Sequence, residues 1–332
     1  MKGKKNTILI CAGIVGVILC AGASLAFGSR NVAIGEVIRA LLHSDMKDFD
    51  ALVVRERIPR TVFGMIAGAS LGVSGALMQA ITRNPVADPS VLGVNTGASL
   101  FVVGGIAFFH INTANEYIWF ALAGATLTTI FVYRIGSMGS GGATPIKLAL
   151  AGAATSAALS SLVSAIVLPR TEAMNSFRFW QVGSVGGATW QGVLMVIPFL
   201  IVGLFIGILS TPALNALALG DDVATGLGVR TGVIRIVAAF AGVLLCGATT
   251  AIAGPIGFVG LMIPHIMRML FGPDLRFIVP MSAVGGAILL TFSDIVGRLI
   301  VNQGELEAGI VTAFLGAPIL ILIAMRVKVR SL

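Results

Sequence analysis

Charged side chains are scarce in this sequence. Asp, Glu, Lys and Arg make up 11% of its 332 residues, against roughly 25% in a soluble globular domain. Hydrophobic residues reach 57%. So little charge argues against a soluble domain and indicates an integral membrane protein.

Cysteine and histidine are also rare, with three residues of each. Cys11, Cys20 and Cys246 all lie in apolar runs, and they form neither a disulfide framework nor a CxxC motif. No cluster of His, Cys and carboxylate residues has metal-ligand spacing, so we expect no metal site. The sequence also lacks a G-x-x-x-x-G-K-[ST] motif, so the chain has no phosphate-cradling loop and we expect no cofactor on it.

Ionisable residues are almost absent from the apolar runs. Ion-coupled transporters usually place Asp, Glu or His near the bilayer midplane. Here the clearest intramembrane acid is Asp294, close to the outer end of its run, and Arg298 follows at i+4, where the two can pair. With no ion relay and no nucleotide site, a transporter of this kind must be passive or draw energy from a partner.

What the sequence does contain is a series of apolar runs near the length of about 20 residues that a membrane span needs. We therefore predict an all-α integral membrane protein with about ten transmembrane helices in a single multi-pass domain over residues 1–332. The first run exceeds the apolar core of a signal peptide, which favours a retained span. The runs lie near 8–28, 61–81, 90–110, 117–136, 146–168, 190–210, 232–250, 255–269, 277–300 and 307–326.

The basic residues are scattered along the chain, mostly between the spans, and do not form one face. The net charge of +8 therefore indicates no nucleic-acid partner, and the bilayer is the surrounding partner. With ten spans and the N-terminus inside, thirteen of the 22 Lys and Arg residues lie on the cytoplasmic side. This excess follows the positive-inside rule and predicts that both termini are cytoplasmic.

Small residues fill the second span. In a bilayer, glycine lets helix backbones approach closely, so this stripe predicts tight helix packing. Ser70 and Ser74 lie within it, in patterns that resemble serine-hydrolase motifs, and an intramembrane serine protease is therefore an alternative. Helix packing is the better account, because the three histidines all fall in or near loops, away from these serines. The glycines of the stripe are Gly64, Gly68, Gly72 and Gly75.

The segment 211–231 is polar and too short to span a membrane. Thr211 and Pro212 are typical of a helix start, and Gly220 can end that helix. Asp221 can cap a second short helix, which Gly226 or Gly228 can end. Two short helices are predicted here.

The acids of this segment bear on its partner. Asp221 and Asp222 are repelled by an anionic lipid surface, so a groove on a protein is a better partner than lipid. A plain linker packed against its own bundle is the alternative.

Six motifs, in order, resemble those of the FecCD-type permeases of ATP-binding-cassette (ABC) importers, which carry iron-siderophore, haem or cobalamin. The similarity to the cobalamin and ferric-enterobactin uptake permeases covers residues 30–326. It implies the type II ABC importer permease fold. The motifs are RIPR (57–60), SGALMQAITRNPVADPSVLGVNTGAS (74–99), FWQVGS (179–184), ALGDDVATGLGV (218–229), GPIGFVGLMIPHIMR (254–268) and GELEAGIVTAFLGAP (304–318).

The resemblance also implies roles for individual residues. His265 and Arg268 could support a contact with the ATPase or be structural. Docking of a solute-binding protein maps onto Arg57, Arg60 and Arg298, although anchoring of a span end is an alternative for the first two. The inner gate maps onto Asn84, Pro85, Val86, Thr144, Pro145 and Ile146. Coupling to the ATPase maps onto Leu219, Gly220, Asp221, Asp222, Ala224, Leu227 and Gly228.

These inferences predict a non-enzymatic permease subunit in a bacterial cytoplasmic membrane. Its expected partners are a second, identical or homologous permease subunit, two ATP-binding subunits that carry ATP and Mg²⁺, and an extracytoplasmic solute-binding protein. Ferric siderophore is the first expectation for the cargo, and haem and cobalamin are alternatives. An ion-coupled carrier and an intramembrane protease are less favoured.

Overall fold

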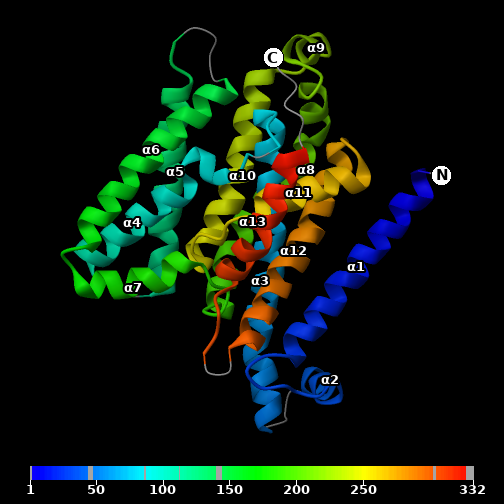
Figure 1. Cartoon of the computed structure of the whole chain (residues 1–332), viewed down its shortest axis with the longest axis vertical. Coiled ribbons are helices and arrows are strands. Elements are labelled where there is room, and N and C mark those ends of the chain that lie inside the picture. The colour runs from blue at the N-terminus through cyan, green and yellow to red at the C-terminus, as the bar shows by residue number, and fades with distance from the viewer. Residues whose placement is uncertain are drawn as a thin grey trace.

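All ten apolar runs coincide with helices in the computed structural model of the chain (Figure 1). The structure describes residues 2–43, 48–85, 87–111, 113–139, 144–301 and 304–326, and these ranges contain helices and no strand. The helices are α1 (Lys2–Ala26), α2 (Ile34–Leu42), α3 (Phe49–Thr82), the 3₁₀ helix η1 (Pro89–Leu92), α4 (Val94–Phe109), α5 (Ala114–Gly136), α6 (Pro145–Val167), α7 (Thr171–Val182), α8 (Trp190–Leu217), α9 (Asp221–Gly226), α10 (Thr231–Ala253), α11 (Val259–Phe271), α12 (Leu275–Ile300) and α13 (Ala308–Arg326).

Seven of the described helices are long and apolar enough to cross a membrane: α1, α3, α5, α6, α8, α10 and α12. The shorter apolar helices α4, α11 and α13 occupy the other three predicted spans. Helix α3 is central and packs against α12, α10, α11, α8, α1 and α2. The helices α4, α5 and α6 pack together beside this core.

The two ends of the bundle carry different short helices (Figure 1). Helix α9 lies at one end, and the last turn of α13 and the start of α1 are directed toward it. We call this the α9 end. Helices α2 and α7 lie toward the opposite end, where α7 crosses the ends of the neighbouring helices, and we call this the α7 end.

Helix α3 begins at Phe49 and not near residue 61, so the start of the predicted span 61–81 is corrected. Residues 29–60, between the first two predicted spans, contain α2 and the first turns of α3. The charged residues Arg55, Glu56 and Arg57 lower the hydropathy of these turns and hide them from a search for apolar runs. Their backbone is nevertheless helical, and Pro59 is accommodated within the helix.

Helix α8 also corrects a prediction, because it continues through Thr211 and Pro212 and does not restart there. A proline inside a helix leaves the carbonyl four residues earlier without its N–H donor. Here the Thr211 hydroxyl donates to the Ile208 carbonyl at 2.8 Å and supplies that missing donor. The predicted pair of short helices is therefore the end of α8 followed by one short helix, α9.

The glycine stripe of α3 confirms the predicted close packing. A Cβ atom added at Gly68 would overlap the Gly286 carbonyl of α12, and one added at Gly75 would overlap Gly260 of α11. These helices therefore approach until their backbones touch, and van der Waals packing of this kind stabilises helix pairs in a bilayer.

This packing predicts the effect of adding one methyl group. We expect Gly75→Ala to destabilise the folded protein by about 1–3 kcal/mol, because overpacking forces the two backbones apart. Gly104→Ala in α4 is the matched control, since no atom lies within 4 Å of its added Cβ. Thermal unfolding of the purified variants in detergent measures the difference, and equal midpoints for the two variants would contradict the packing argument.

Candidate functional site

The short helix α9 projects from the α9 end of the bundle and is fixed by its own backbone signals. It begins after Gly220, whose φ of +119° and ψ of 154° lie in a region that essentially only glycine adopts. Gly228, at φ +83°, ends it. The Gly228 N–H bonds to the Thr225 carbonyl at 2.9 Å and the Val229 N–H to the Ala224 carbonyl at 3.0 Å, which is a Schellman motif. Of the two predicted helix ends, Gly226 is the last helical residue and Gly228 has the left-handed conformation that follows it, whereas Asp221 is the first helical residue and not the cap.

Asp221 attaches α9 to the ends of two long helices. Its carboxylate is paired with Arg83, at the end of α3, and with Arg235 of α10, whose Nη2 lies 2.9 Å from Oδ2. The Ala224 side chain beneath it is fully buried. Asp221 therefore makes its ion pairs within the chain, and α9 is connected to both α3 and α10.

The opposite side of this segment is apolar and exposed. Leu219, Val223 and Leu227 expose 65%, 48% and 63% of their surface, and Asp222 beside them is exposed. Large apolar side chains gathered on a polar end of a protein mark an interaction surface. We call these three residues the α9 patch.

The predicted gate residues lie at the same end of the chain's helices. Asn84 and Pro85 follow α3 and are exposed, and the Ala87 N–H bonds to the Asn84 carbonyl at 3.1 Å, which closes a turn. Val86 lies outside the described residues. Asp88 accepts a hydrogen bond from the Ser90 amide at 2.9 Å; burial raises the pKa of its carboxyl, and the Ser90 hydrogen bonds oppose that rise.

The second predicted gate segment begins α6. The Thr144 hydroxyl accepts a hydrogen bond from the Lys147 amide at 3.4 Å and caps the helix, and Pro145 is the first helical residue. Ile146 is 70% exposed. The segment therefore presents an apolar side chain at the start of a helix that is largely uncovered in the single chain.

The three arginines predicted to dock a binding protein lie together at the α7 end, but two of them are buried. Arg57 is 8% exposed and donates to the carbonyls of Leu25 at 3.0 Å and Arg30 at 2.6 Å. Arg298 is 2% exposed and donates to Ser24 Oγ at 2.9 Å. Both guanidinium groups are therefore engaged inside the chain, and docking of a binding protein through these three arginines stays a prediction.

Asp294 is the centre of this cluster. Arg60 Nη2 lies 2.7 Å from its carboxylate and Arg298 Nη2 lies 3.0 Å from it, so the predicted i, i+4 pair of Asp294 and Arg298 is confirmed. Arg60 also contacts Glu305 at 2.7 Å, and that carboxylate is 38% exposed. A cavity of about 410 Å³ opens beside Arg57 and Arg60. Glu305 and this cavity are the parts of the cluster that solvent reaches.

Comparison with known proteins identifies the family of the chain. The model of the FecCD transport family matches residues 16–326. The chain belongs to this family. It is 42% identical over 311 residues to the ferric enterobactin transport system permease protein FepD of Escherichia coli, covering 93% of this chain and 92% of the relative. It is 38% identical over 325 residues to the Fe(3+)-citrate import system permease protein YfmD of Bacillus subtilis, covering 98% and 96%.

A solved structure has the same fold over 98% of the FecCD chain. It is described as an inward-facing conformation of a metal-chelate type ABC transporter, and it superposes with a TM-score of 0.84 at 25% identity, covering 98% of this chain and 100% of that one. The family and the type of fold predicted from the six motifs are therefore confirmed. This FecCD protein is a multi-pass membrane permease.

The serines that suggested a protease are inaccessible in this FecCD protein. Ser70 and Ser74 are fully buried, and Ser74 donates a hydrogen bond to the Gly242 carbonyl at 2.5 Å. A peptide substrate cannot reach either hydroxyl. Within the described residues, no group of three or more His, Cys, Asp and Glu side chains is placed to hold a metal ion.

Several contacts at these sites were not predicted from the sequence. Arg83 and Arg235 hold Asp221 from 138 and 14 residues away along the chain, and Glu305 reaches Arg60 across 245 residues. No spacing rule connects such positions. The one sequence feature that could have indicated these ion pairs is charge. Acidic residues are few, so each basic residue at an end of the bundle has few possible partners.

Proposed function

We propose that this FecCD permease is the membrane-spanning subunit of an ABC importer that moves an iron chelate across the cytoplasmic membrane. Ferric siderophore is the favoured cargo, and haem and cobalamin are the alternatives. The α9 patch carries this proposal, because a chain without a phosphate-binding motif must receive its energy through a contact with another protein. The names of the relatives, which transport ferric enterobactin and ferric citrate, support the cargo.

In this proposal the α9 end faces the cytoplasm and both termini lie there. An ATP-binding subunit, which holds ATP and Mg²⁺, presents a groove that receives the side chains of the α9 patch. Asp221 connects α9 to Arg83 and Arg235, so a displacement of α9 is transmitted directly to the ends of α3 and α10. The gate segment around Asn84 directly follows α3. The segment around Ile146 begins α6, which packs against α4 and α5.

The assembly contains two permease subunits, two ATP-binding subunits and a solute-binding protein. The inference of a second permease subunit is supported by helix α6, because only 17% of its most apolar stretch is buried within one chain. At the α7 end, the binding protein approaches the cavity beside Arg60. Arg57 and Arg298 also line this cavity. A carboxylate of the binding protein competes with Glu305 for the ion pair with Arg60.

Reconstitution tests the proposal. The permease is placed in proteoliposomes with the ATP-binding subunit inside and the binding protein outside, and uptake of radioactive ferric citrate, ferric enterobactin, a ferric hydroxamate, haem and cobalamin is measured. We expect ATP-dependent uptake of a ferric chelate that persists when the proton gradient is dissipated. Uptake that survives removal of the ATP-binding subunit and collapses with the proton gradient would contradict the proposal and favour an ion-coupled carrier.

A further inference from the structure

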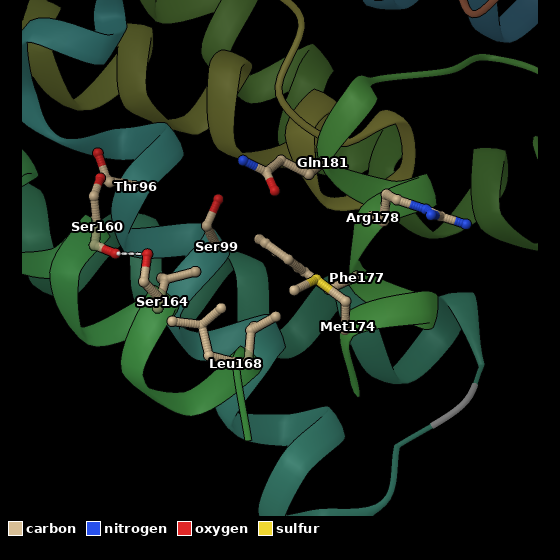
Figure 2. Close-up of a pocket in the computed structure, with 11 residues that line it drawn as sticks. Thr96, Ser99, Ser160, Ser164, Leu168, Met174, Phe177, Arg178 and Gln181 are labelled. Atoms are coloured by element: carbon tan, nitrogen blue, oxygen red, sulfur yellow. Dashed lines mark hydrogen bonds between the residues drawn. The ribbon is translucent and has the colours of Figure 1, made fainter. Parts of the chain in front are cut away.

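A cavity of about 320 Å³ lies between α4, α6 and α7 (Figure 2), and none of its lining residues belongs to the α9 patch or to the arginine cluster. Its size is at the lower end of the range of small-molecule sites, roughly 300–1,000 Å³. One side is polar, and the other is formed by Val163, Met174 and Phe177. The polar side consists of Thr96, Ser99, Ser160, Ser164 and Gln181.

The polar side chains come from three separate helices and converge on the cavity. Thr96 and Ser99 belong to α4, Ser160 and Ser164 to α6, and Gln181 to α7. In Figure 2 the Gln181 side chain extends toward the hydroxyl groups. A Gln side chain exposed to lipid tails would have an unsatisfied amide, so this side of the bundle faces water, cargo or protein and not the bilayer.

The hydrogen bonds within the chain determine which groups are still available to a ligand. The hydroxyls of Ser99 and Ser164 donate to backbone carbonyls four residues back, at 2.9 Å and 3.0 Å, and Thr96 bonds to Ser156 Oγ at 3.1 Å. Their oxygen lone pairs can still accept a hydrogen bond. Within the described residues, Gln181 has no hydrogen-bond partner in the chain, so its amide offers two donors and an acceptor.

The lining also defines the charge of the ligand. No acidic or lysine side chain lines the cavity. Arg178 stands at its rim, and its side chain extends away from the hydroxyl groups in Figure 2. Neutral donors and acceptors beside an apolar wall match an amphipathic ligand with amide, hydroxyl or ester groups. An isolated cation has no counter-charge on this wall.

We propose that this cavity is a side site in which the permease holds the neutral amide and hydroxyl groups of its chelate while α7 covers the cargo. The inference rests on the proposed function. It adds that the permease itself contributes to the choice of chelate, because ligands with differently placed polar groups would bind this wall differently. The cavity takes one flank of the cargo, and the rest of the molecule lies in the path beside α6.

The double variant Ser164→Ala with Gln181→Leu tests this site. Each neutral hydrogen bond contributes about 0.5–1.5 kcal/mol, so we expect the two changes together to weaken chelate binding about tenfold. The measurement is equilibrium binding of the ferric chelate that the wild-type complex imports best. It uses the permease and ATP-binding subunits in nanodiscs without the binding protein, and initial uptake rates for two chelates are compared in proteoliposomes.

Ser161→Ala is the matched control. Ser161 is on the same helix, is exposed, and donates to the carbonyl four residues back at 3.0 Å, as Ser164 does, but it does not line the cavity. We expect this variant to bind and import like wild type and to keep the wild-type basal ATPase activity. A variant that fails to assemble is replaced by Ser164→Ala alone, for which about a threefold loss is expected.

The outcomes separate this inference from the proposed function. Import by wild type with equal chelate affinity in the double variant and the control would overturn the side site and leave the importer function intact. Absence of any chelate import by the wild-type complex would overturn the importer function itself. A tenfold loss confined to the cavity variants, with a changed ratio of uptake rates between the two chelates, would support the site.

Discussion

Leu227→Asp is expected to abolish chelate uptake while the permease still folds and inserts. Leu227 is 63% exposed, so its replacement disturbs little inside the chain. In the proposed complex its side chain fills a groove on the ATP-binding subunit, and burial of a leucine contributes roughly 1.5–3 kcal/mol. Aspartate loses this contribution and adds a charge without a partner. We expect association with the ATP-binding subunit to weaken more than about tenfold.

The measurement is co-purification of the ATP-binding subunit together with ATP-driven uptake in proteoliposomes. Leu227→Met is the control, because it keeps an apolar side chain of similar volume at the same position and usually costs little. Normal uptake by the Leu227→Asp variant would rule out docking through the α9 patch.

A substitution of Asp221 distinguishes docking of the ATP-binding subunit from the attachment of α9 to the bundle. Asp221→Asn removes the ion pairs with Arg83 and Arg235 but leaves the α9 patch intact. Because the carboxylate is 43% exposed, each pair contributes within about 1 kcal/mol. We therefore expect Asp221→Asn to retain the ATP-binding subunit and to lose part of the coupling between ATP hydrolysis and uptake.

The positions of the membrane helices were predictable because the bilayer leaves few choices. A backbone in hydrocarbon must satisfy its own hydrogen bonds, so a long apolar run becomes a helix. The prediction was wrong where polar residues continue a helix, as at Phe49–Arg60 of α3. It was also wrong at Pro212, where a hydroxyl of the preceding residue replaces the missing donor. The first error arises because charged residues lower the hydropathy of turns that are nevertheless helical, and the second because a hydropathy pattern does not contain the side-chain hydrogen bond of Thr211.

The candidate sites were predicted as segments and not as contacts. The glycines that bound α9 follow from local rules, and the structure agrees with them. The burial of Arg57 does not follow from such rules, because its acceptors are backbone carbonyls at and beyond the end of α1. A sequence shows charge but not which carbonyl oxygens converge on it, so an arginine that binds a partner and one that holds two helices together look the same.

Asp294→Ala is expected to destabilise the protein more than any other single substitution of a charged residue discussed above. Asp294 is 3% exposed and is shared by Arg60 and Arg298. Its removal leaves buried cationic charge without compensation, and breaking a buried pair in this way costs about 3–5 kcal/mol. Asp50→Ala is the control, because its pair with Arg30 is exposed and contributes at most about 1 kcal/mol. Thermal unfolding in detergent compares the two variants.

A double variant distinguishes lost charge compensation from lost packing. In Asp294→Ala with Arg298→Met the most buried guanidinium is also removed, and Arg60 keeps Glu305 as its partner at 2.7 Å. If unpaired charge causes the loss, the double variant should be more stable than Asp294→Ala alone, because replacing both members of a buried pair is often neutral. If the cavity left by the carboxylate causes it, the second substitution should add to the first. Equal midpoints for Asp294→Ala and Asp50→Ala would show that the cluster is solvated, and Arg298 would then be open to a binding-protein carboxylate.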